Sequence, residues 1–404
     1  MIPPRGAAGA ADQSPERRRP ERTWTRREYK GKKKPLNRLL IVTIATVVLL
    51  VGGGFIAPST VSFSALQLML PFFAVLGVAS IGQHLVIQQR GLDLSVAGIM
   101  SFSAVIVSAL PSSQAGVGET LAFVALALAM GLGVGAVNGV LVALLRVNSL
   151  VTTIGMNSLM LGITMYVTRG FSQQAPPPLN AFGVGKFMEI PLTLYVLLVI
   201  AAIAIFVLAK TTVGRRFIAT SVNPDAAITV GIPLDLYRVA TYALAGFCYA
   251  AAGVLLAGYV LSPTVFSGMP YLLATVAAVV VGGNPIGGGL RGSVTATIIG
   301  ALFLTYLGQL VLAVGFETSA QNIVQAIIII ASVGLVEAGR RIKFEWIKFK
   351  FWVTSPDVEF RIRTIYTRTL TRLGLSRLLD VSPETRTRWR TFYLRMKKRL
   401  EITE

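Results

Sequence analysis

Apolar runs of about 20 residues recur from Leu39 to Val336, and they constrain the fold more than any other feature of the chain. A helix of that length can cross a bilayer because every backbone N–H and C=O finds its partner inside the segment. Only 14% of the 404 residues are charged, against roughly 25% in a soluble domain. Membrane β-barrels show short alternating segments instead of such runs. The sequence therefore predicts an all-α, polytopic helical membrane protein.

Hydropathy predicts about ten transmembrane segments, of which the third and the eighth are short for a full crossing. They span residues 39–57, 65–89, 94–110, 119–145, 150–168, 190–209, 237–261, 270–283, 292–313 and 321–338.

Positive charge gathers at the two ends of the chain. Residues 1–38 hold twelve Lys or Arg against four Asp or Glu, and residues 340–404 hold seventeen against seven. Basic segments beside membrane spans tend to stay in the cytoplasm, so both termini are expected inside. The chain thus divides into a basic, disordered cytoplasmic tail (1–38), a transmembrane domain (39–338) and a basic cytoplasmic or interfacial extension (339–404).

The tails suit the membrane surface. The block "GKKKP" precedes the first span, and "RRIKFEWIKFKFWV" interleaves aromatic and basic residues after the last one. Lipid is the expected partner of both tails, and docking of a cytoplasmic protein is an alternative for the C-terminal one. Nucleic acid is not expected, because neither a recognised fold nor an aromatic platform accompanies the charge.

The stretch "RGLDLSVAG" (90–98) places a carboxylate inside an apolar region. A charged residue in a span costs roughly 3 kcal/mol on insertion scales, so it faces a cavity or a partner. Gly91 permits a helix break, and Asp93 can N-cap a helix that starts at Leu94. Two interpretations remain open: a capped turn between helices, or a broken helix that lines a substrate path together with Ser95.

A second break is predicted at "GGNPIGGGLRGS" (282–293), where Gly282, Gly283 and Pro285 interrupt the apolar pattern. The segment lacks the pattern of a nucleotide-binding loop, so a structural role is expected.

Polar residues inside the spans carry further hypotheses. Asn138, Asn148 and Asn157 can bond across helices or can contact a polyhydroxylated substrate. His84 has no cluster of metal-ligand residues around it, so a packed or interfacial role is expected and no metal site is predicted.

Two loops stand out between the spans. Within the inner loop 210–236, Asn223 suits an N-cap, Pro224 the first helical position, Asp225 the first turn and Gly231 the stop, which predicts a short helix at about 224–230. So short a helix needs packing, against this protein or a partner. In the outer loop 169–189, three prolines disfavour a helix.

No arrangement of nucleophile, base and acid indicates a catalytic centre, so an enzyme is not expected. An ion-coupled carrier would show more ionisable groups in its spans. Energy is therefore expected to come from outside this polypeptide.

Four segments resemble, in order, the permease subunits of ribose-type ABC sugar importers. They are "GLDLSVAG" (91–98), "VNGVLVALLRVNSLVTTIGMNSLMLGI" (137–163), "SVNPDAAITVGI" (221–232) and "AVVVGGNPIGGGLRGSVTATIIGAL" (278–302).

The resemblance implies a multi-pass subunit of a prokaryotic plasma membrane that moves a ribose-, xylose- or galactose-like monosaccharide by alternating access. A second permease chain, cytoplasmic ATPase subunits that bind ATP, and an extracytoplasmic solute-binding protein would be its partners, and the chain itself would hold no cofactor. It implies a substrate pathway that includes Asp93, Ser95, Asn138 and Asn157. It also implies an ATPase coupling loop formed by Gly214, Arg215, Asn223, Pro224, Asp225, Ala226, Ala227 and Gly231.

The sequence departs from the family pattern at Ala97, at Asn284-Pro285 and at Gln83-His84, which bears on the identity of the substrate. Alternatives are a permease for nucleosides or branched-chain amino acids, a self-sufficient secondary transporter, and a membrane scaffold whose basic tails recruit partners.

Overall fold

The computed structural model describes residues 38–112, 114–171, 174–288, 292–317, 323–324 and 326–327. In this part of the chain, seven helices are long and apolar enough to cross a membrane. They are α1 (Arg38–Ile56), α2 (Phe63–Gln88), α4 (Val117–Ala143), α5 (Ser149–Thr168), α7 (Leu192–Lys210), α10 (Leu234–Val260) and α12 (Val294–Ala313). Two shorter apolar helices, α3 (Val96–Ala109) and α11 (Tyr271–Val281), lie where short spans were expected. The prediction of an all-α, multi-pass membrane protein is confirmed.

Nine of the ten predicted segments therefore correspond to helices, with ends that differ by at most three residues. The tenth, 321–338, lies almost wholly outside the described residues, as do both basic tails. The total number of spans and the cytoplasmic location of both termini stay predictions.

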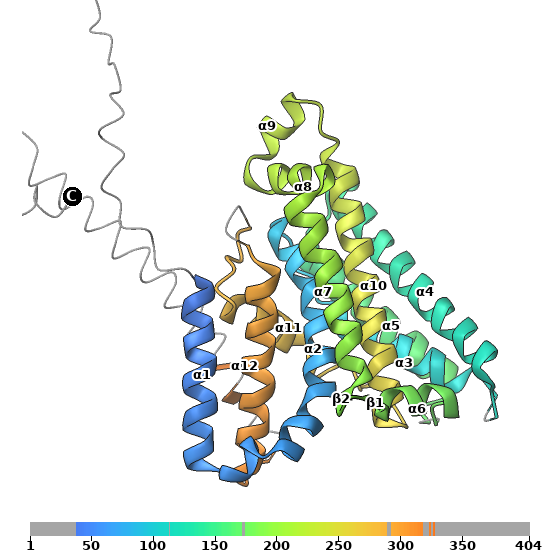
Figure 1. Cartoon of the computed structure of the whole chain (residues 1–404). Helices are drawn as coiled ribbons and strands as arrows, with labels where there is room; N and C mark the ends of the chain where they lie inside the picture. The colour runs from blue at the N-terminus through green and yellow to red at the C-terminus, as the bar shows by residue number, and fades with distance from the viewer. Residues whose placement is uncertain are drawn as a thin grey trace, which may run out of the picture. The chain divides into compact units, whose positions relative to one another are not determined.

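The connections contain shorter elements: the 3-10 helix η1 (Pro58–Val61), α6 (Pro177–Val184), α8 (Thr212–Val222) and α9 (Pro224–Thr229). Strands β1 (Lys186–Phe187) and β2 (Ile190–Pro191) pair antiparallel, with Lys186 opposite Pro191. In Figure 1, α8 and α9 lie at one end of the long helices, whereas α6 and the two strands lie at the other.

The expectation of no helix in the loop 169–189 is wrong, because α6 forms there. Pro176 is its N-cap residue, and Pro177 and Pro178 occupy its first two positions. The first N–H groups of a helix have no partner inside it, so proline loses nothing there and its fixed φ favours the helix.

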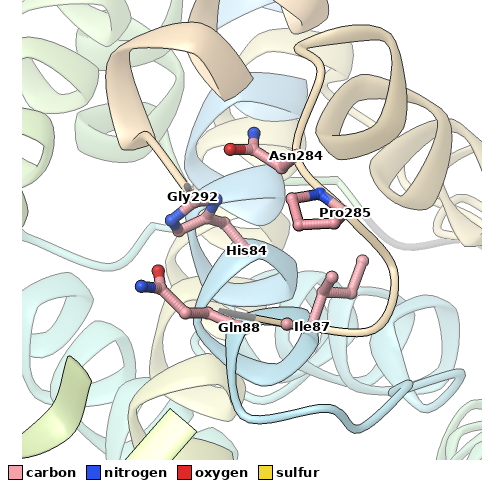
Figure 2. Close-up of a pocket in the computed structure, with 7 residues that line it drawn as sticks. His84, Ile87, Gln88, Asn284, Pro285 and Gly292 are labelled. Atoms are coloured by element: carbon pink, nitrogen blue, oxygen red, sulfur yellow. The ribbon is translucent and has the colours of Figure 1, made fainter. Parts of the chain in front are cut away.

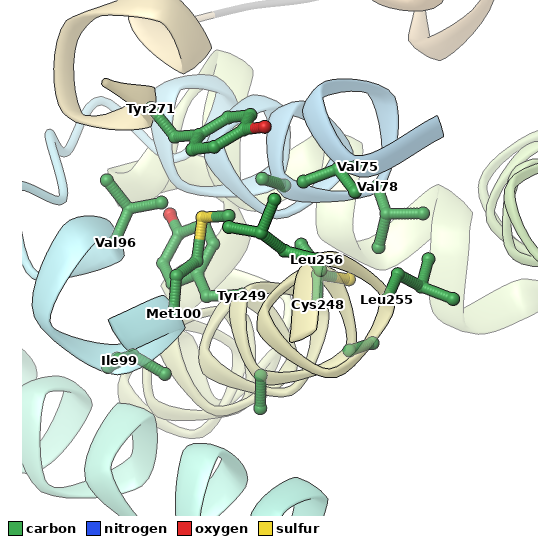
Figure 3. Close-up of a cluster of buried hydrophobic side chains, with 14 of the residues drawn as sticks. Val75, Val78, Val96, Ile99, Met100, Cys248, Tyr249, Leu255, Leu256 and Tyr271 are labelled. Atoms are coloured by element: carbon green, nitrogen blue, oxygen red, sulfur yellow. The ribbon is translucent and has the colours of Figure 1, made fainter. Parts of the chain in front are cut away.

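Helices α2 and α10 form the centre of the bundle. α10 packs against α2, α3 and α4, and α2 also packs against α7, α11 and α12 (Figure 1). Buried side chains from α2, α3, α10 and α11 meet in one apolar cluster, in which Tyr249 and Met100 are fully enclosed (Figure 3). Burial reaches 67% and 72% of the apolar windows of α2 and α10, but only 17–28% of those of α1, α4, α5 and α7. The latter helices therefore present apolar outer faces.

Close contact between α4 and α10 depends on small residues. Gly131, Gly135 and Gly139 recur every fourth position on the buried face of α4, and a Cβ at any of them would collide with α10. Such spacing lets two backbones approach closely in a membrane.

Candidate functional site

The predicted break at Gly91 is real, but the residue with unusual backbone geometry is Arg90. α2 ends at Gln88, and Arg90 adopts a left-handed conformation with φ of 65°. Its N–H donates to Ile87 O at 2.9 Å and that of Gly91 to Val86 O at 3.0 Å. This pair of bonds is the Schellman motif that ends many helices. Gly91 is required for another reason, because the Tyr242 hydroxyl occupies the space that a Cβ would need.

The proposed N-cap role of Asp93 needs correction. α3 starts at Val96 rather than at Leu94, and the Leu94 N–H donates to Thr153 Oγ1 of α5 at 3.0 Å. The Asp93 carboxylate instead accepts from the N–H and the hydroxyl of Ser95, at 2.9 and 2.6 Å. A bond to the residue two positions on forms an Asx turn, which precedes the helix without capping it. The contact with α5 displaces the helix start that local sequence favoured.

A residue from another helix supplies the missing cap. Gly98 is the third residue of α3, and its N–H has no partner within the helix. Asn157 of α5 accepts this N–H at 2.7 Å. A Cβ at Gly98 would overlap the backbone of Asn157, so the close approach of the two helices requires the glycine.

The four residues assigned to the substrate pathway are thus brought together. Asn138 of α4 donates to the Ser95 hydroxyl at 2.9 Å, so Asp93, Ser95 and Asn138 form a chain of contacts. Asn157 of α5 lies nearby, where it binds the N–H of Gly98 in the first turn of α3. Asp93, Ser95 and Asn138 are completely buried. Their observed bonds join α3 to α4 and α5, which agrees with the packing alternative for the asparagines. Contact between these side chains and a solute stays a prediction.

A second buried polar cluster was not predicted as a site. It joins α2 to the first turn of α12 and to the segment between α11 and α12, and it contains His84, Gln88, Asn284, Ser293 and Thr297. The Asn284 amide donates to Thr297 Oγ1 at 2.9 Å and accepts from the Ser293 N–H at 2.6 Å. Thr297 Oγ1 lies 2.9 Å from His84 Nδ1, between residues 213 positions apart in sequence. We call this set the His84 cluster.

The three predicted break residues at 282–285 shape this segment. α11 ends at Val281, Gly283 adopts φ of 78°, and the Cα of Gly282 lies against Ala296 of α12. Pro285 lines a small hollow together with His84, Ile87, Gln88, Asn284, Gly288 and Gly292 (Figure 2). The helix break therefore brings the polar Asn284 to α2.

The sequence contained a signal for this cluster. His84 and Asn284-Pro285 are departures from the family pattern, and the structure places them side by side. Gln88 follows His84 by four positions, hence on the same face of α2. What the sequence lacked was any indication that the two segments meet.

The loop assigned to ATPase coupling forms the predicted short helix. Asn223 accepts from the Ala226 N–H at 3.1 Å, α9 starts at Pro224, and Gly231 adopts φ of 78° after its end. The predicted helix 224–230 differs from the observed one by a single residue. Asp225 and Ala226 are exposed, but Ala227 is 3% exposed and packs inward.

Beside them, Val222, Ile228 and Val230 expose 42%, 56% and 73% of their surface. We call these three side chains the α9 surface. Exposed apolar groups on a loop outside the spans are typical of a protein contact.

Helix α8 precedes α9 and was not predicted. Thr211 caps it by accepting from the Gly214 N–H at 3.1 Å, and Gly214 lies so close to Val207 and Leu208 of α7 that no larger residue fits. Gly214 is therefore buried, whereas Arg215 is exposed. A cap at Thr211 followed by buried positions at 214, 217 and 221 is the pattern that could have revealed the helix.

Helix α8 holds the end of α2. Gln89 Nε2 donates to Phe217 O at 2.8 Å and to Thr220 Oγ1 at 3.0 Å, and Arg90 donates to Val222 O at 3.0 Å. The Ser221 hydroxyl donates to the backbone carbonyl of Gln88. The coupling loop thus contacts α2 one turn from His84. We call this end, which carries Arg90, Arg146, Lys210, Arg215, Arg216 and Arg238, the basic end.

Comparison with known proteins gives a consistent result. The family model described as "Branched-chain amino acid transport system / permease component" matches residues 65–333. The chain is 30% identical over 295 residues to the ribose import permease protein of Escherichia coli (strain K12), covering 72% of this chain and 91% of that protein. It is 29% identical over 296 residues to the ribose import permease protein of Haemophilus influenzae, covering 72% and 90%.

It is also 29% identical over 299 residues to the autoinducer 2 import system permease protein of Shigella flexneri, covering 73% of this chain and 85% of that protein. No solved structure matches the chain. The matched region runs from α2 to beyond α12, so it contains both polar clusters and the coupling loop.

Proposed function

Since the chain belongs to the permease family described as branched-chain amino acid transport system permease component, we propose that it is the membrane subunit of an ABC importer for a monosaccharide. The observation that carries this proposal is the similarity to a ribose import permease over 91% of that protein's length. The substrate proposed is a ribose-, xylose- or galactose-like sugar.

The proposed partners follow from this assignment. Cytoplasmic ATPase subunits bind the nucleotide and dock on the α9 surface at the basic end. An extracytoplasmic solute-binding protein delivers the sugar at the opposite end, where α6 and the β1–β2 hairpin lie, and a second copy of this chain completes the pathway. The chain itself holds no cofactor, and the complex resides in a prokaryotic plasma membrane. The exposed apolar side chains of the α9 surface and the basic residues of the same end support the orientation.

Alternating access is the proposed mechanism. Movement of α9 by the ATPases passes to α8, which is joined to the end of α2 by the Gln89 and Arg90 bonds. Because α2 lies at the centre of the bundle against α10, α11 and α12, a shift of its end alters the helix contacts around the pathway. The structure thus offers a continuous series of packed groups from the coupling loop to the His84 cluster.

Reconstitution tests the proposal. The chain would be purified with its ATPase, placed in liposomes with ATP inside, and given labelled D-ribose, D-xylose or D-galactose with the binding protein outside. We expect uptake of one sugar that needs both ATP and the binding protein and that resists ionophores. Uptake that persists without the ATPase and collapses with the ion gradient would instead establish a secondary transporter.

A further inference from the structure

We propose that His84 and Gln88, held in place by Thr297 and Asn284, form a site that binds a hydroxyl group of the imported solute at the basic end. This inference rests on the proposed function and adds to it the group on the substrate that is recognised.

Two unused hydrogen-bonding atoms point to a ligand. His84 and Gln88 are 1% and 5% exposed, and both line the hollow in Figure 2. Neither His84 Nε2 nor Gln88 Oε1 makes a hydrogen bond of normal geometry within the described part of the chain, although the two side chains lie close enough to interact with each other. A buried polar atom without a partner costs about 1–3 kcal/mol, so such atoms in a folded protein call for a water or a ligand.

The other atoms of the cluster hold the imidazole in place. The amide nitrogen of Asn284 donates to Val279 O, Ser293 O and Thr297 Oγ1, and the side-chain oxygen accepts from the Ser293 N–H. The amide hydrogens of Asn284 are therefore engaged, and the role of this residue is to position Thr297. Thr297 in turn binds His84 Nδ1 at 2.9 Å, which fixes the ring with Nε2 free.

The chemistry of the two free atoms favours a hydroxyl. Gln88 Oε1 can only accept, so its ligand must donate. His84 Nε2 donates if Thr297 donates to Nδ1, and accepts if Thr297 instead donates to Ser293 O at 3.3 Å. A hydroxyl group can both donate and accept, so it satisfies either tautomer and the Gln88 carbonyl as well.

The described residues that line the hollow include no Lys, Arg, Asp or Glu: they are His84, Ile87, Gln88, Asn284, Pro285, Gly288 and Gly292. A hydroxyl group needs only hydrogen bonds to offset the loss of its hydration there. A Cβ at Gly292 would lie 2.9 Å from Gln88 Oε1 and 3.3 Å from His84 Cε1, so only glycine leaves space beside these two side chains.

Selectivity for single hydroxyl groups tests the inference. Liposomes with the complete importer would be supplied with D-ribose, D-xylose and D-galactose and with monodeoxy analogues of each. Two variants remove the free atoms. Gln88→Met keeps the side-chain length, and His84→Asn can still bind Thr297 through an amide in place of Nδ1. Gln309→Met is the matched control, because Gln309 lies twelve residues from Thr297 on α12, about 18 Å along the helix.

For each protein we would measure the initial uptake rate of the parent sugar divided by that of the analogue. Every sample contains the same binding protein, so the selectivity of the binding protein cancels when these ratios are compared between variants. For one of the analogues, this ratio should be about tenfold higher in wild type and in Gln309→Met than in Gln88→Met or His84→Asn. If wild type transports a sugar and all four proteins show the same ratios for every analogue, the hydroxyl site is wrong while the importer stands. If wild type transports none of the sugars, both proposals fall.

Discussion

At the scale of single residues, buried polar groups decide how the helices join. The Asp93 carboxylate lies in the protein interior, where its Oδ1 accepts both the N–H and the hydroxyl of Ser95. Ser95 in turn accepts from Asn138, so one carboxylate orders a turn that three helices share. Oδ2 of Asp93 has no hydrogen-bond partner among the described residues. The bonds of Oδ1 give Asp93 a structural role, and Oδ2 is the atom through which it could act in transport.

Substitution at Asp93 can distinguish these roles. Asp93→Ala removes the acceptor and leaves the buried Ser95 N–H unpaired, which should destabilise the fold by about 1–3 kcal/mol. Asp93→Asn retains a carbonyl oxygen at Oδ1, so its melting temperature in detergent should be close to that of wild type. Equal melting temperatures for the Ala variant and wild type would show that the turn does not depend on the carboxylate. A stable Asn variant without uptake would assign Asp93 to transport.

At the scale of the helices, close packing depends on where the small residues lie. α4 carries Gly131, Gly135 and Gly139 on the face toward α10, while Gly133 of the same helix has open space around it. Dispersion contacts and close backbone approach hold membrane helices together, so the first three glycines matter for packing and the fourth does not.

A matched pair of substitutions tests this difference. Gly135→Ala should push α4 from the backbone of Tyr242 and destabilise the protein by about 1–3 kcal/mol. Gly133→Ala adds the same methyl group to the same helix without a collision, and it should leave stability unchanged or raise it slightly. Thermal unfolding of both variants in one detergent gives the comparison. Similar losses in the two would mean that contact with detergent, rather than α4–α10 packing, sets the effect.

At the scale of the whole molecule, the two kinds of exposed apolar surface have different uses. The outer faces of α1, α4, α5 and α7 lie along helices that are long and apolar enough to cross a bilayer, so apolar surface is expected there. The α9 surface lies on a connection between the long helices α7 and α10 at the basic end, outside the helices that can cross a membrane. A protein partner is the occupant that we propose for it, and the ATPase is the partner that an importer requires.

Ile228→Asp tests that assignment. A charge at this 56%-exposed position should reduce copurification of the ATPase by about tenfold or more, because it must be desolvated in an apolar contact. Phe187→Asp, at a 59%-exposed position of the opposite end, serves as the control. Ala227 is unsuitable for this test, since it is buried and a bulky residue there would disturb α9 itself. Undiminished ATPase association with Ile228→Asp would place the docking surface elsewhere.

The sequence by itself determined what depends on neighbouring residues. The length of each apolar run specified nine helices, and the order Asn223, Pro224 and Gly231 specified α9, because spans, caps and left-handed stops depend on positions close together in the chain. Helix α8 was not predicted from local sequence: the Thr211 cap marks its start, but its buried face depends on packing against α7 and α2.

Only the tertiary structure decided which distant groups meet. Asn157 caps α3, Thr153 takes the N–H that would have started that helix at Leu94, and Thr297 and Asn284 hold the ring of His84. Local sequence does not reveal these partners, since groups up to 213 positions apart are joined only by the way the helices pack. Residues that the sequence marked as unusual, His84 and Asn284, therefore acquired a shared site only when the break after α11 placed them against each other.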